Sequence, residues 1–356
     1  MCWAGVTPVF ADSYRIATLN TGLSRKGPGL LLRDIRRGED AQILMVRHMI
    51  GAVRPDILVL TGFDYDYDLQ ALAGFQALLA KAGHEMPHRF AFAPNSGMYT
   101  GLDMDGDGRV GTARDAQGYG EFAGQGGMAI LSVFPIDAGA ARDFSMILWP
   151  ELPGAGFGDL PVHPTQRLSS VGHWDVPVLV GNGAPLHVLT FHATTPAFDG
   201  PEDRNGLRNR DEIGVWSSYL DGGLGVKPPD QRFVIVGDAN LDPTDGDGQK
   251  QAIVDLIARP DLQDPKPASR GGAEASRAQG GVNLVQAGDP SLDTADWRDA
   301  EGPGNLRVDY VLPSRDLTVA DAGVFWPAPG EPGYDIIADR DLTQSWHGLV
   351  WVDVLR

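Results

Sequence analysis

The chain has 356 residues, and its 42% hydrophobic and 21% charged content is typical of a globular protein with a substantial core. Its formal net charge of −18 disfavours a nucleic-acid partner, because such partners are bound mainly through Lys and Arg. No apolar run reaches the 18 residues that predict a membrane span, and the lone Cys2 excludes an internal disulfide or a cysteine zinc cluster.

Short runs rich in β-branched residues predict buried strands along the chain. They are Arg15–Leu19, Ile57–Leu60, Met128–Ser132, Leu186–Phe191, Phe233–Val236, Val308–Leu312 and Leu349–Val352. Helical spacing of apolar residues predicts helices over Asp40–Val53, Leu69–Ala82, Asp211–Leu220 and Gln249–Ile257. Strands interleaved with helices indicate an α/β protein with mixed sheets covered by helices.

Glycine and proline are abundant, with 46 and 26 residues, and they predict long loops. The longest are expected over Ala93–Gly126 and Pro260–Pro303, and loops of this length are often functional. No repeat or low-complexity linker divides the chain, so residues 1–356 are expected to form a single domain. The apolar segment Met1–Phe10 has no preceding basic region and does not predict a signal peptide.

Polar residues follow or begin several predicted strands, where a rigid sheet can hold side chains around one point. They are Asn20, His192, Asp238, Asn240, Asp309 and His347. Asp238 and Asn240 lie two apart on an extended segment and project to the same face, as a base or metal ligand beside an amide donor. A buried Asp309 would fix the tautomer of His347, and His192 could donate to a developing oxyanion.

The ordered motifs resemble the endonuclease/exonuclease/phosphatase superfamily, in a bacterial branch with long insertions. They are Thr18-Leu19-Asn20, Arg54–Leu60, Gly127–Ser132, Gly237–Asn240, Arg307–Leu312 and Ser345-x-His347, with insertions at Phe198–Gly206 and Gly302–Asn305. The resemblance implies a four-layered α/β/β/α sandwich of two mixed β-sheets flanked by helices. It also implies phosphoester hydrolysis with a divalent cation, commonly magnesium, manganese or calcium.

The resemblance assigns a role to each residue of the set. Asn20 resembles the residue near the metal, Asp238 the acid that ligates the metal and activates water, and Asn240 the residue that orients the phosphate. His192 resembles the phosphate-contacting histidine. His347 and Asp309 resemble the transition-state histidine and its orienting acid.

Two positions depart from the family pattern. Gly62 stands where a metal-ligating glutamate is expected, and Trp346 where Ser-Asp-His would place an aspartate. Neither supplies a side-chain oxygen for a hard cation, so a weakened metal site is predicted. Val133 and Gly348 also stand where a basic residue is usual.

Asp64, two residues beyond Gly62, is a candidate substitute ligand, with Asp66 two further on. Asp103, Asp105 and Asp107, followed by Gly108, resemble the opening of a calcium loop. The twelfth position of that loop is Arg114, with Asp115 adjacent. A structural calcium site and a solvated acidic turn are both consistent with this segment.

The remaining motifs favour structural roles. Asp242–Gly248 predicts turn chemistry, with a cation site as the alternative. His163 and His173 are expected in loops or partly buried. Arg204, Arg208 and Arg210 are expected on a solvated, acid-paired face, with an anion-binding role for one of them as the alternative.

Three functional hypotheses remain open. The first is a metal-dependent phosphoester hydrolase with a degraded metal site, acting on a small or extracellular phosphoester. The second is an inactive or repurposed relative that binds a ligand or a protein partner. The third is a metal-free reaction with His347 and Asp309 as an acid–base pair. The acidic composition and the resemblance predict an extracytoplasmic protein, periplasmic or secreted.

Overall fold

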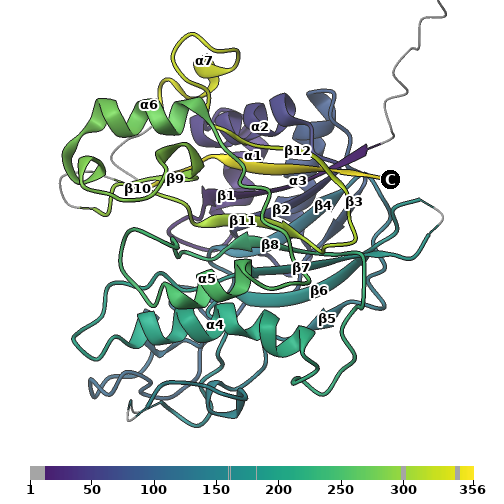
Figure 1. Ribbon diagram of the computed structural model, residues 1–356. Helices are drawn as coiled ribbons and strands as arrows, with labels where there is room; N and C mark the ends of the chain where they lie inside the picture. Colours follow the sequence, from purple (N-terminus) through teal and green to yellow (C-terminus); the bar gives the residue numbers. More distant parts are fainter. Residues whose placement is uncertain (1–12, 159, 161, 182, 298–301, 341–344) are drawn as a thin grey trace, which may run out of the picture.

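The computed structural model describes residues 13–158, 160, 162–181, 183–297, 302–340 and 345–356. Two large β-sheets lie face to face at the centre of the molecule, and helices cover their outer faces (Figure 1). The segment Met1–Phe10, with Cys2, lies outside the described residues, so the prediction about a signal peptide stays untested. Within the described part of the chain, no helix has the length and apolar character needed to cross a bilayer.

The first sheet has six strands in the order β12-β14-β1-β2-β4-β3. Its strands are β1 (Ser13–Leu23), β2 (Ile57–Phe63), β3 (His88–Phe90), β4 (Gly127–Ser132), β12 (Val319–Phe325) and β14 (Leu349–Leu355). β1 and β2 are parallel, whereas the other adjacent pairs are antiparallel. Every residue of β2 is buried, as expected for a central strand with both faces covered.

The second sheet has five strands in the order β11-β8-β7-β6-β5. Its strands are β5 (Arg142–Asp143), β6 (Gly172–Val178), β7 (Leu186–His192), β8 (Phe233–Asp238) and β11 (Asp309–Pro313). β7 and β8 are parallel, and the other adjacent pairs are antiparallel. Both sheets are therefore mixed, as the sequence predicted.

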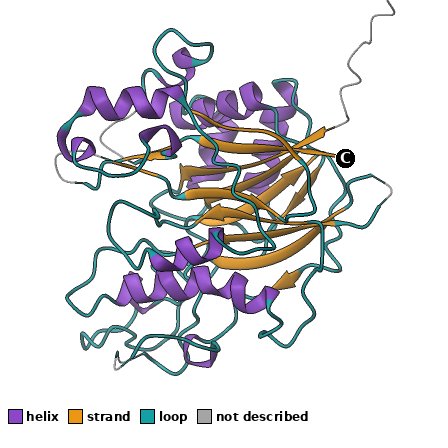
Figure 2. Ribbon diagram, in the orientation of Figure 1, coloured by secondary structure: helices purple, strands orange, loops and turns teal. Residues whose placement is uncertain are grey.

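The helices complete the α/β/β/α sandwich (Figure 2). Those on the first sheet are α1 (Leu30–Arg37), α2 (Ala41–Val53) and α3 (Gln70–Lys81), and those on the second are α4 (Arg204–Leu220) and α5 (Gln251–Ile257). Apolar side chains of α4 and α5 join the outward face of the second sheet in one buried cluster. The predicted four-layered fold is confirmed.

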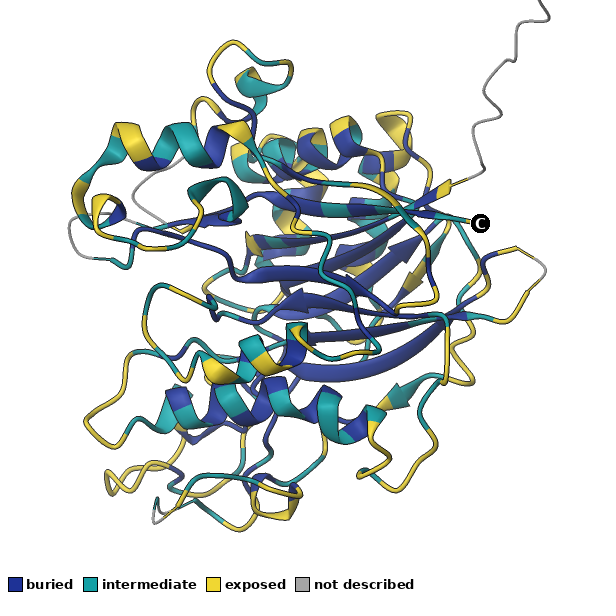
Figure 3. Cartoon of the chain, in the orientation of Figure 1, coloured by how far each residue is buried: buried dark blue, intermediate teal, exposed yellow. Residues whose placement is uncertain are grey.

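The core lies mainly between the two sheets. A single buried cluster contains Leu19 and Val59 from the first sheet and Val188, Val236 and Val311 from the second. Burial is continuous through these central strands (Figure 3). Removal of this apolar surface from water holds the sheets together and so fixes the strand ends where the candidate site residues lie.

The segment Pro260–Pro303, expected to be a loop, contains regular structure. It includes α6 (Arg270–Gln279), short strand β9 (Ala295–Asp296) and 3-10 helices η3 (Gly281–Leu284) and η4 (Pro290–Leu292). β9 pairs with β10 (Asn305–Leu306) and β13 (Trp346–His347) in a small third sheet. α6 is polar and begins at a Ser269 cap, so it lacks the apolar stripe from which a helix is recognised.

The seven predicted strands and four predicted helices are all present. The remaining short elements are α7 (Tyr334–Ile337), η1 (Ala113–Asp115) and η2 (Trp149–Glu151). β6 was not predicted, because His173 and Asp175 interrupt its apolar pattern. α4 begins at Arg204 rather than Asp211, because its first two turns carry few apolar residues.

Candidate functional site

Three site residues lie side by side across adjacent strands of the second sheet. His192 at the end of β7 pairs with Asp238 of β8, and Asp238 pairs with Asp309 of β11. The sheet register alone therefore brings together three polar residues that are far apart in the sequence. Successive side chains of a strand point to opposite faces of the sheet. A register slip of one residue would therefore turn these three side chains to the other face.

Asp238 lies at the centre of this row and is fully buried. Its Oδ2 atom accepts a hydrogen bond of 2.8 Å from Asn20 Nδ2, and its Oδ1 atom accepts one of 2.8 Å from the backbone N–H of Asn240. His192 Nε2 lies 3.5 Å from the same Oδ2. These contacts fix the carboxylate while it faces neighbours from both sheets.

His347 and Asp309 form a buried pair. Nδ1 of His347 lies 2.8 Å from Oδ2 of Asp309, which leaves Nε2 available to a ligand. Thr294 supports the acid, since its hydroxyl donates to Asp309 Oδ2 over 2.9 Å and accepts from the Val308 and Asp309 backbone N–H groups. Trp297 packs edge-on against the His347 ring, with 5.4 Å between the centroids.

Burial and neighbouring charges set the protonation of this pair. Burial raises the pKa of Asp309 to about 6, although His347 opposes the shift and the charge of Asp238 adds to it. Burial alone would lower the pKa of His347. The charge and hydrogen bond of Asp309, together with the charge of Asp238, outweigh it and raise this pKa. The carboxylates of Asp309 and Asp238 therefore stabilise the imidazolium form of His347 relative to that of a free histidine.

His192 and Asn240 lie on either side of Asp238, and each has a polar group that can still bind a ligand. Burial lowers the pKa of His192, so the ring is neutral at pH 7, and its Nδ1 atom has no partner among the described residues. Asn240 adopts a left-handed backbone with φ of 49°, and its Nδ2 atom donates to Ala193 O over 2.9 Å. That bond leaves the second amide hydrogen of Asn240 for a ligand.

A cavity of about 730 Å³, the main cavity, opens beside these residues. Its lining includes Asn20, His192, Thr195, Pro196, Phe198, Asn240, Asp242, Asp247, Trp297, Leu306 and His347. Among the described residues the lining carries two aspartates and no lysine or arginine. The predicted residues Asn20, His192, Asp238, Asn240, Asp309 and His347 thus lie on or directly behind one cavity.

Gly62 occupies a bulge where β1, β2 and β4 shift register. Its φ is +63°, and a Cβ at this position would lie 2.4 Å from Asn20 Oδ1. Asn20 Oδ1 in turn accepts a hydrogen bond of 3.1 Å from the Gly22 backbone N–H. The backbone and Asn20 together fill the space where a side chain at position 62 would begin.

Trp346 is part of the hydrophobic core and is 6% exposed. Its ring packs edge-on against Trp326, with 5.0 Å between the centroids, and lies under the guanidinium of Arg340 at 5.1 Å. A tryptophan here provides an N–H donor but no acceptor oxygen. We refer to Asn20, Gly62 and Trp346 as the cation half of the site, and to His192, Asp238, Asp309 and His347 as the His–Asp half.

Other departures from the family pattern have structural explanations. Val133 follows β4, whose last residue Ser132 pairs with Ile57 at the start of β2, so Val133 lies at the opposite end of β2 from Gly62. A Cβ at Gly348 would lie 2.8 Å from Val324 Cγ1 and 3.2 Å from the Phe325 carbonyl oxygen. The absence of a base at position 133 therefore has no bearing on the site.

Asp64 and Asp66 are committed to loop and helix structure. Asp64 is buried and accepts hydrogen bonds of 2.9 Å from the backbone N–H groups of Arg25 and Gly126. Asp66 caps α3, since its carboxylate accepts from the Gln70 and Ala71 N–H groups. The structure does not bring either residue to Asp238.

The predicted calcium loop forms a compact acidic group on the surface. Ligand atoms of Asp103, Asp105 and Asp115 all lie within 4.8 Å of one another, whereas Asp107 is not in this group. Asp115 is buried and accepts from the backbone N–H groups of Met104 and Thr112. Asp115, adjacent to the twelfth position, therefore joins the acids that open the loop.

The remaining motifs serve structural roles in the described residues. Asp242 holds a turn, accepting from the Thr244, Asp245 and Arg307 N–H groups. His163 is half-buried. His173 is buried between Ser169 and the Glu212 carbonyl, and burial lowers its pKa to about 3.

The expectation of a solvated arginine face is wrong for Arg208. This side chain is buried and donates to the Leu168, Gln117 and Arg167 carbonyls. Arg210 lies 2.9 Å from Asp211, and is acid-paired as expected. The carbonyl groups that accept from Arg208 belong to segments distant in the sequence, so the local sequence does not reveal them.

A divalent cation does not fit the cation half of the site. Asn20 Oδ1 is a single neutral oxygen and is already hydrogen-bonded, while Gly62 and Trp346 contribute no side-chain oxygen. Atoms of Asp238, Asp309 and His347 lie within 4.8 Å of one another, but they are engaged in the hydrogen bonds described above. Any chemistry at this site therefore has to come from the side chains of the His–Asp half and Asn240.

Sequence reasoning missed two residues of the site, Thr294 and Trp297. Both lie within the segment Pro260–Pro303, which was expected to be a long loop, and neither belongs to a recognisable motif. The only available signal was their position in a long loop, since such loops often carry functional residues.

Comparisons with known proteins agree with this architecture. The model of the Endonuclease/Exonuclease/phosphatase family matches residues 17–338. A solved endonuclease/exonuclease/phosphatase structure from Beutenbergia cavernae is 18% identical, with a TM-score of 0.55, over 96% of this chain and 71% of that chain.

Two further solved structures of that family show the same fold. The protein from Leptotrichia buccalis is 11% identical with a TM-score of 0.50, over 96% of this chain and 99% of that chain. The protein from Bacteroides thetaiotaomicron is 13% identical with a TM-score of 0.50, over 97% and 98%. No curated protein sequence gives a significant match.

Proposed function

The chain belongs to the endonuclease/exonuclease/phosphatase family, and from that premise we propose that it hydrolyses a small phosphoester. The observation that carries this proposal is the row of His192, Asp238 and Asp309 at one register, with His347 Nδ1 2.8 Å from Asp309. Two imidazoles and the Asn240 amide thereby line the main cavity, and the buried carboxylate of Asp238 lies directly behind them.

Asp238 is the proposed base. Asn20 and the Asn240 backbone hold its carboxylate in place, so it can accept a proton from a water molecule in the main cavity. The water oxygen then bonds to phosphorus as the bond to the leaving oxygen breaks. The water proton passes to Asp238.

The imidazole groups act on the phosphoryl oxygens. Asp309 and Asp238 raise the pKa of His347, and its protonated form stabilises the charge that develops as water attacks. Neutral His192 and the second amide hydrogen of Asn240 supply further donors.

The charge of the main cavity supports a small substrate over a nucleic acid. Its described lining has Asp242 and Asp247 but no lysine or arginine to neutralise successive phosphates. Phe198 and Trp297 offer apolar walls on the same lining. We infer a phosphoester whose remaining part is neutral or cationic.

Hydrolysis of bis(4-nitrophenyl) phosphate and 4-nitrophenyl phosphate tests the proposal. Rates are compared with magnesium, manganese, calcium or EDTA, and against the His347→Ala variant. We expect slow hydrolysis that the variant lacks and that EDTA changes by less than about tenfold. A wild-type rate equal to that of the variant under every condition would contradict it.

A repurposed binding protein is the second candidate, and the cation half favours it. Asn20 closes over the Gly62 backbone and Trp346 belongs to the core, so no acid-bearing side chain is accommodated there without rearrangement. This candidate predicts ligand binding without turnover. Calorimetry that shows tight cation binding, abolished in Asp238→Ala, would count against it.

A further inference from the structure

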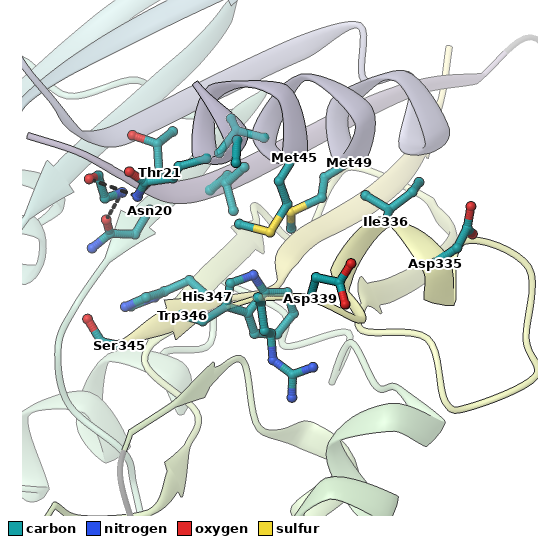
Figure 4. Close-up of a pocket in the computed structure, with 16 residues that line it drawn as sticks. Asn20, Thr21, Met45, Met49, Asp335, Ile336, Asp339, Ser345, Trp346 and His347 are labelled. Atoms are coloured by element: carbon teal, nitrogen blue, oxygen red, sulfur yellow. Dashed lines mark hydrogen bonds between the residues drawn. The ribbon is translucent and has the colours of Figure 1, made fainter. Parts of the chain in front are cut away.

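A second cavity adjoins the main cavity at His347. It has a volume of about 360 Å³ and lies between α2 and β13 (Figure 4). We name it the methionine cavity; its lining includes Leu19, Gln42, Met45, Val46, Met49, Ile336 and Trp346. Asn20, Ser345 and His347 line both cavities, so the two cavities adjoin at these residues.

One face of α2 forms the upper wall of the methionine cavity in Figure 4. Gln42, Met45 and Met49 are spaced three and four residues apart and share that face. Methionine side chains are flexible and polarisable, and they adapt to ligands of irregular shape. Trp346 and Ile336 face them from the other side.

Trp346 carries an unused hydrogen-bond donor. The residue is 6% exposed, and its indole Nε1 atom is buried without a partner among the described residues. A buried indole N–H usually finds an acceptor, and leaving it unpaired costs free energy. A ligand with an acceptor oxygen beside an apolar group would satisfy it.

Charge sets the direction in which a ligand would lie. Asp335 and Asp339 are exposed and line the end of the methionine cavity away from Asn20 (Figure 4). They disfavour an anion there, because Arg340, the cation on the same lining, is already paired with Asp296. The junction with the main cavity is instead lined by Asn20, Ser345 and His347, none of which is acidic. The anionic end of a ligand therefore belongs at His347 and its neutral end near Met45.

We propose that the methionine cavity binds the neutral end of the phosphoester: an aryl or short alkyl group with an acceptor oxygen that faces the Trp346 indole. Its size falls within the range of small-molecule sites. The assignment of the other end to phosphate rests on the proposed function. Position 346, where the family pattern has an aspartate, thus lines an apolar subsite in this chain.

The first experiment needs no activity. The protein has eight tryptophans, and Trp346→Phe identifies the indole N–H signal of Trp346 in a ¹H–¹⁵N spectrum. Acetophenone, an aryl group with a carbonyl acceptor, is then titrated into the wild-type protein. We expect a saturable shift of the Trp346 signal. Absence of any shift up to the solubility of acetophenone would overturn the inference.

Two methionine variants locate the binding. Met45→Glu places a charge in the cavity and should abolish the shift, whereas Met146→Glu changes a methionine that is 62% exposed and should retain it. Circular dichroism confirms that both variants are folded. An unchanged shift in a folded Met45→Glu variant would also overturn the inference.

Calorimetry with two phosphonates separates this inference from the proposed function. Benzylphosphonate should bind on the order of tenfold tighter than methylphosphonate, and Met45→Glu should remove the difference. Equal affinities would overturn the apolar subsite and leave the phosphate site intact. If neither phosphonate binds while acetophenone does, the proposed function fails and the subsite stands.

Discussion

The His–Asp half and the cation half border the same cavity but depend on different kinds of structure. In the first, strand register places His192, Asp238 and Asp309 in a row, and hydrogen bonds fix their orientation. In the second, a left-handed glycine and a buried tryptophan leave no anionic ligand. A family scaffold can therefore retain the side-chain arrangement of one half of its site while the other half changes to backbone and apolar packing.

The largest effect should come from the His–Asp half. His347→Ala removes the proposed charge stabilisation, and we expect hydrolysis of bis(4-nitrophenyl) phosphate to fall about 10²–10⁴-fold. His163→Ala is the matched control, because this half-buried histidine is not part of either cavity lining and its ring is hydrogen-bonded to Thr165 of its own loop. Equal rates in both variants would place the chemistry elsewhere.

Substitution of Gly62 tests whether the cation half has closed. Gly62→Ala combines a positive φ with a close approach to Asn20 Oδ1, so we expect unfolding by urea to show a loss of roughly 1–3 kcal/mol. Gly38→Ala is the control, since its φ is +70° but a Cβ there meets no described atom within 4 Å.

The difference between the two glycines isolates the contact with Asn20. If Gly62→Ala costs no more than Gly38→Ala, the site has room for a side chain at position 62. Gly62→Glu combined with Trp346→Asp would then be expected to raise phosphoesterase activity with magnesium. A larger cost at Gly62 means that reversion of these two positions alone does not rebuild a cation site.

The pH dependence of stability examines the His–Asp half without a substrate. The pKa values of Asp309 and His347 are both raised on folding, so each contributes stability at low pH that is lost as pH rises. For Asp309 the loss extends from about pH 4 to about 6, and for His347 it occurs above pH 6.5. We expect the wild type to lose stability between pH 4.5 and 8.5 relative to the double variant Asp309→Asn with His347→Gln.

That comparison is measured by urea unfolding of both proteins at the two pH values. The double variant lacks both titrating groups and so controls for every other ionisable residue. If the wild type instead gained stability relative to the double variant toward pH 8.5, the pKa values of Asp309 and His347 would not both be raised on folding.

The smallest effect concerns the acidic group on the surface, which we propose to be a structural calcium site. Calcium should raise the Tm of the wild type by a few degrees, as expected for ligand binding to the folded state. Asp103→Asn should remove the increase, whereas Asp107→Asn, outside the acidic group, should retain most of it. An effect of EDTA on Tm without an effect on hydrolysis would separate this site from the active site.

Much of the fold and of the His–Asp half follows from the sequence. The apolar runs locate the strands, and the polar residues at their ends meet because parallel and antiparallel neighbours place those ends on one edge. The contacts that hold these side chains in place are harder to predict from the sequence. Thr294, which orients Asp309, comes from an insertion without a motif, and pairs with the site only through tertiary structure.

The cation half shows where sequence reasoning stops. The missing acids at Gly62 and Trp346 are visible, but the sequence does not contain the backbone angle of Gly62 or the position of Asn20 above it. Val133 stands where a basic residue is usual in the family, yet the antiparallel direction of β4 places it at the end of β2 opposite Gly62. Both depend on how strands are arranged in space, which local composition does not specify.

Thr294 also has a consequence for protein engineering. Its hydroxyl accepts from two backbone N–H groups and donates to Asp309, so this one side chain joins the segment Pro260–Pro303 to the candidate site by three hydrogen bonds. A chimera in which a relative's segment replaces this one would lose these bonds and leave the Asp309 carboxylate without the Thr294 donor. The segment is thus an inseparable part of the active site rather than an exchangeable module.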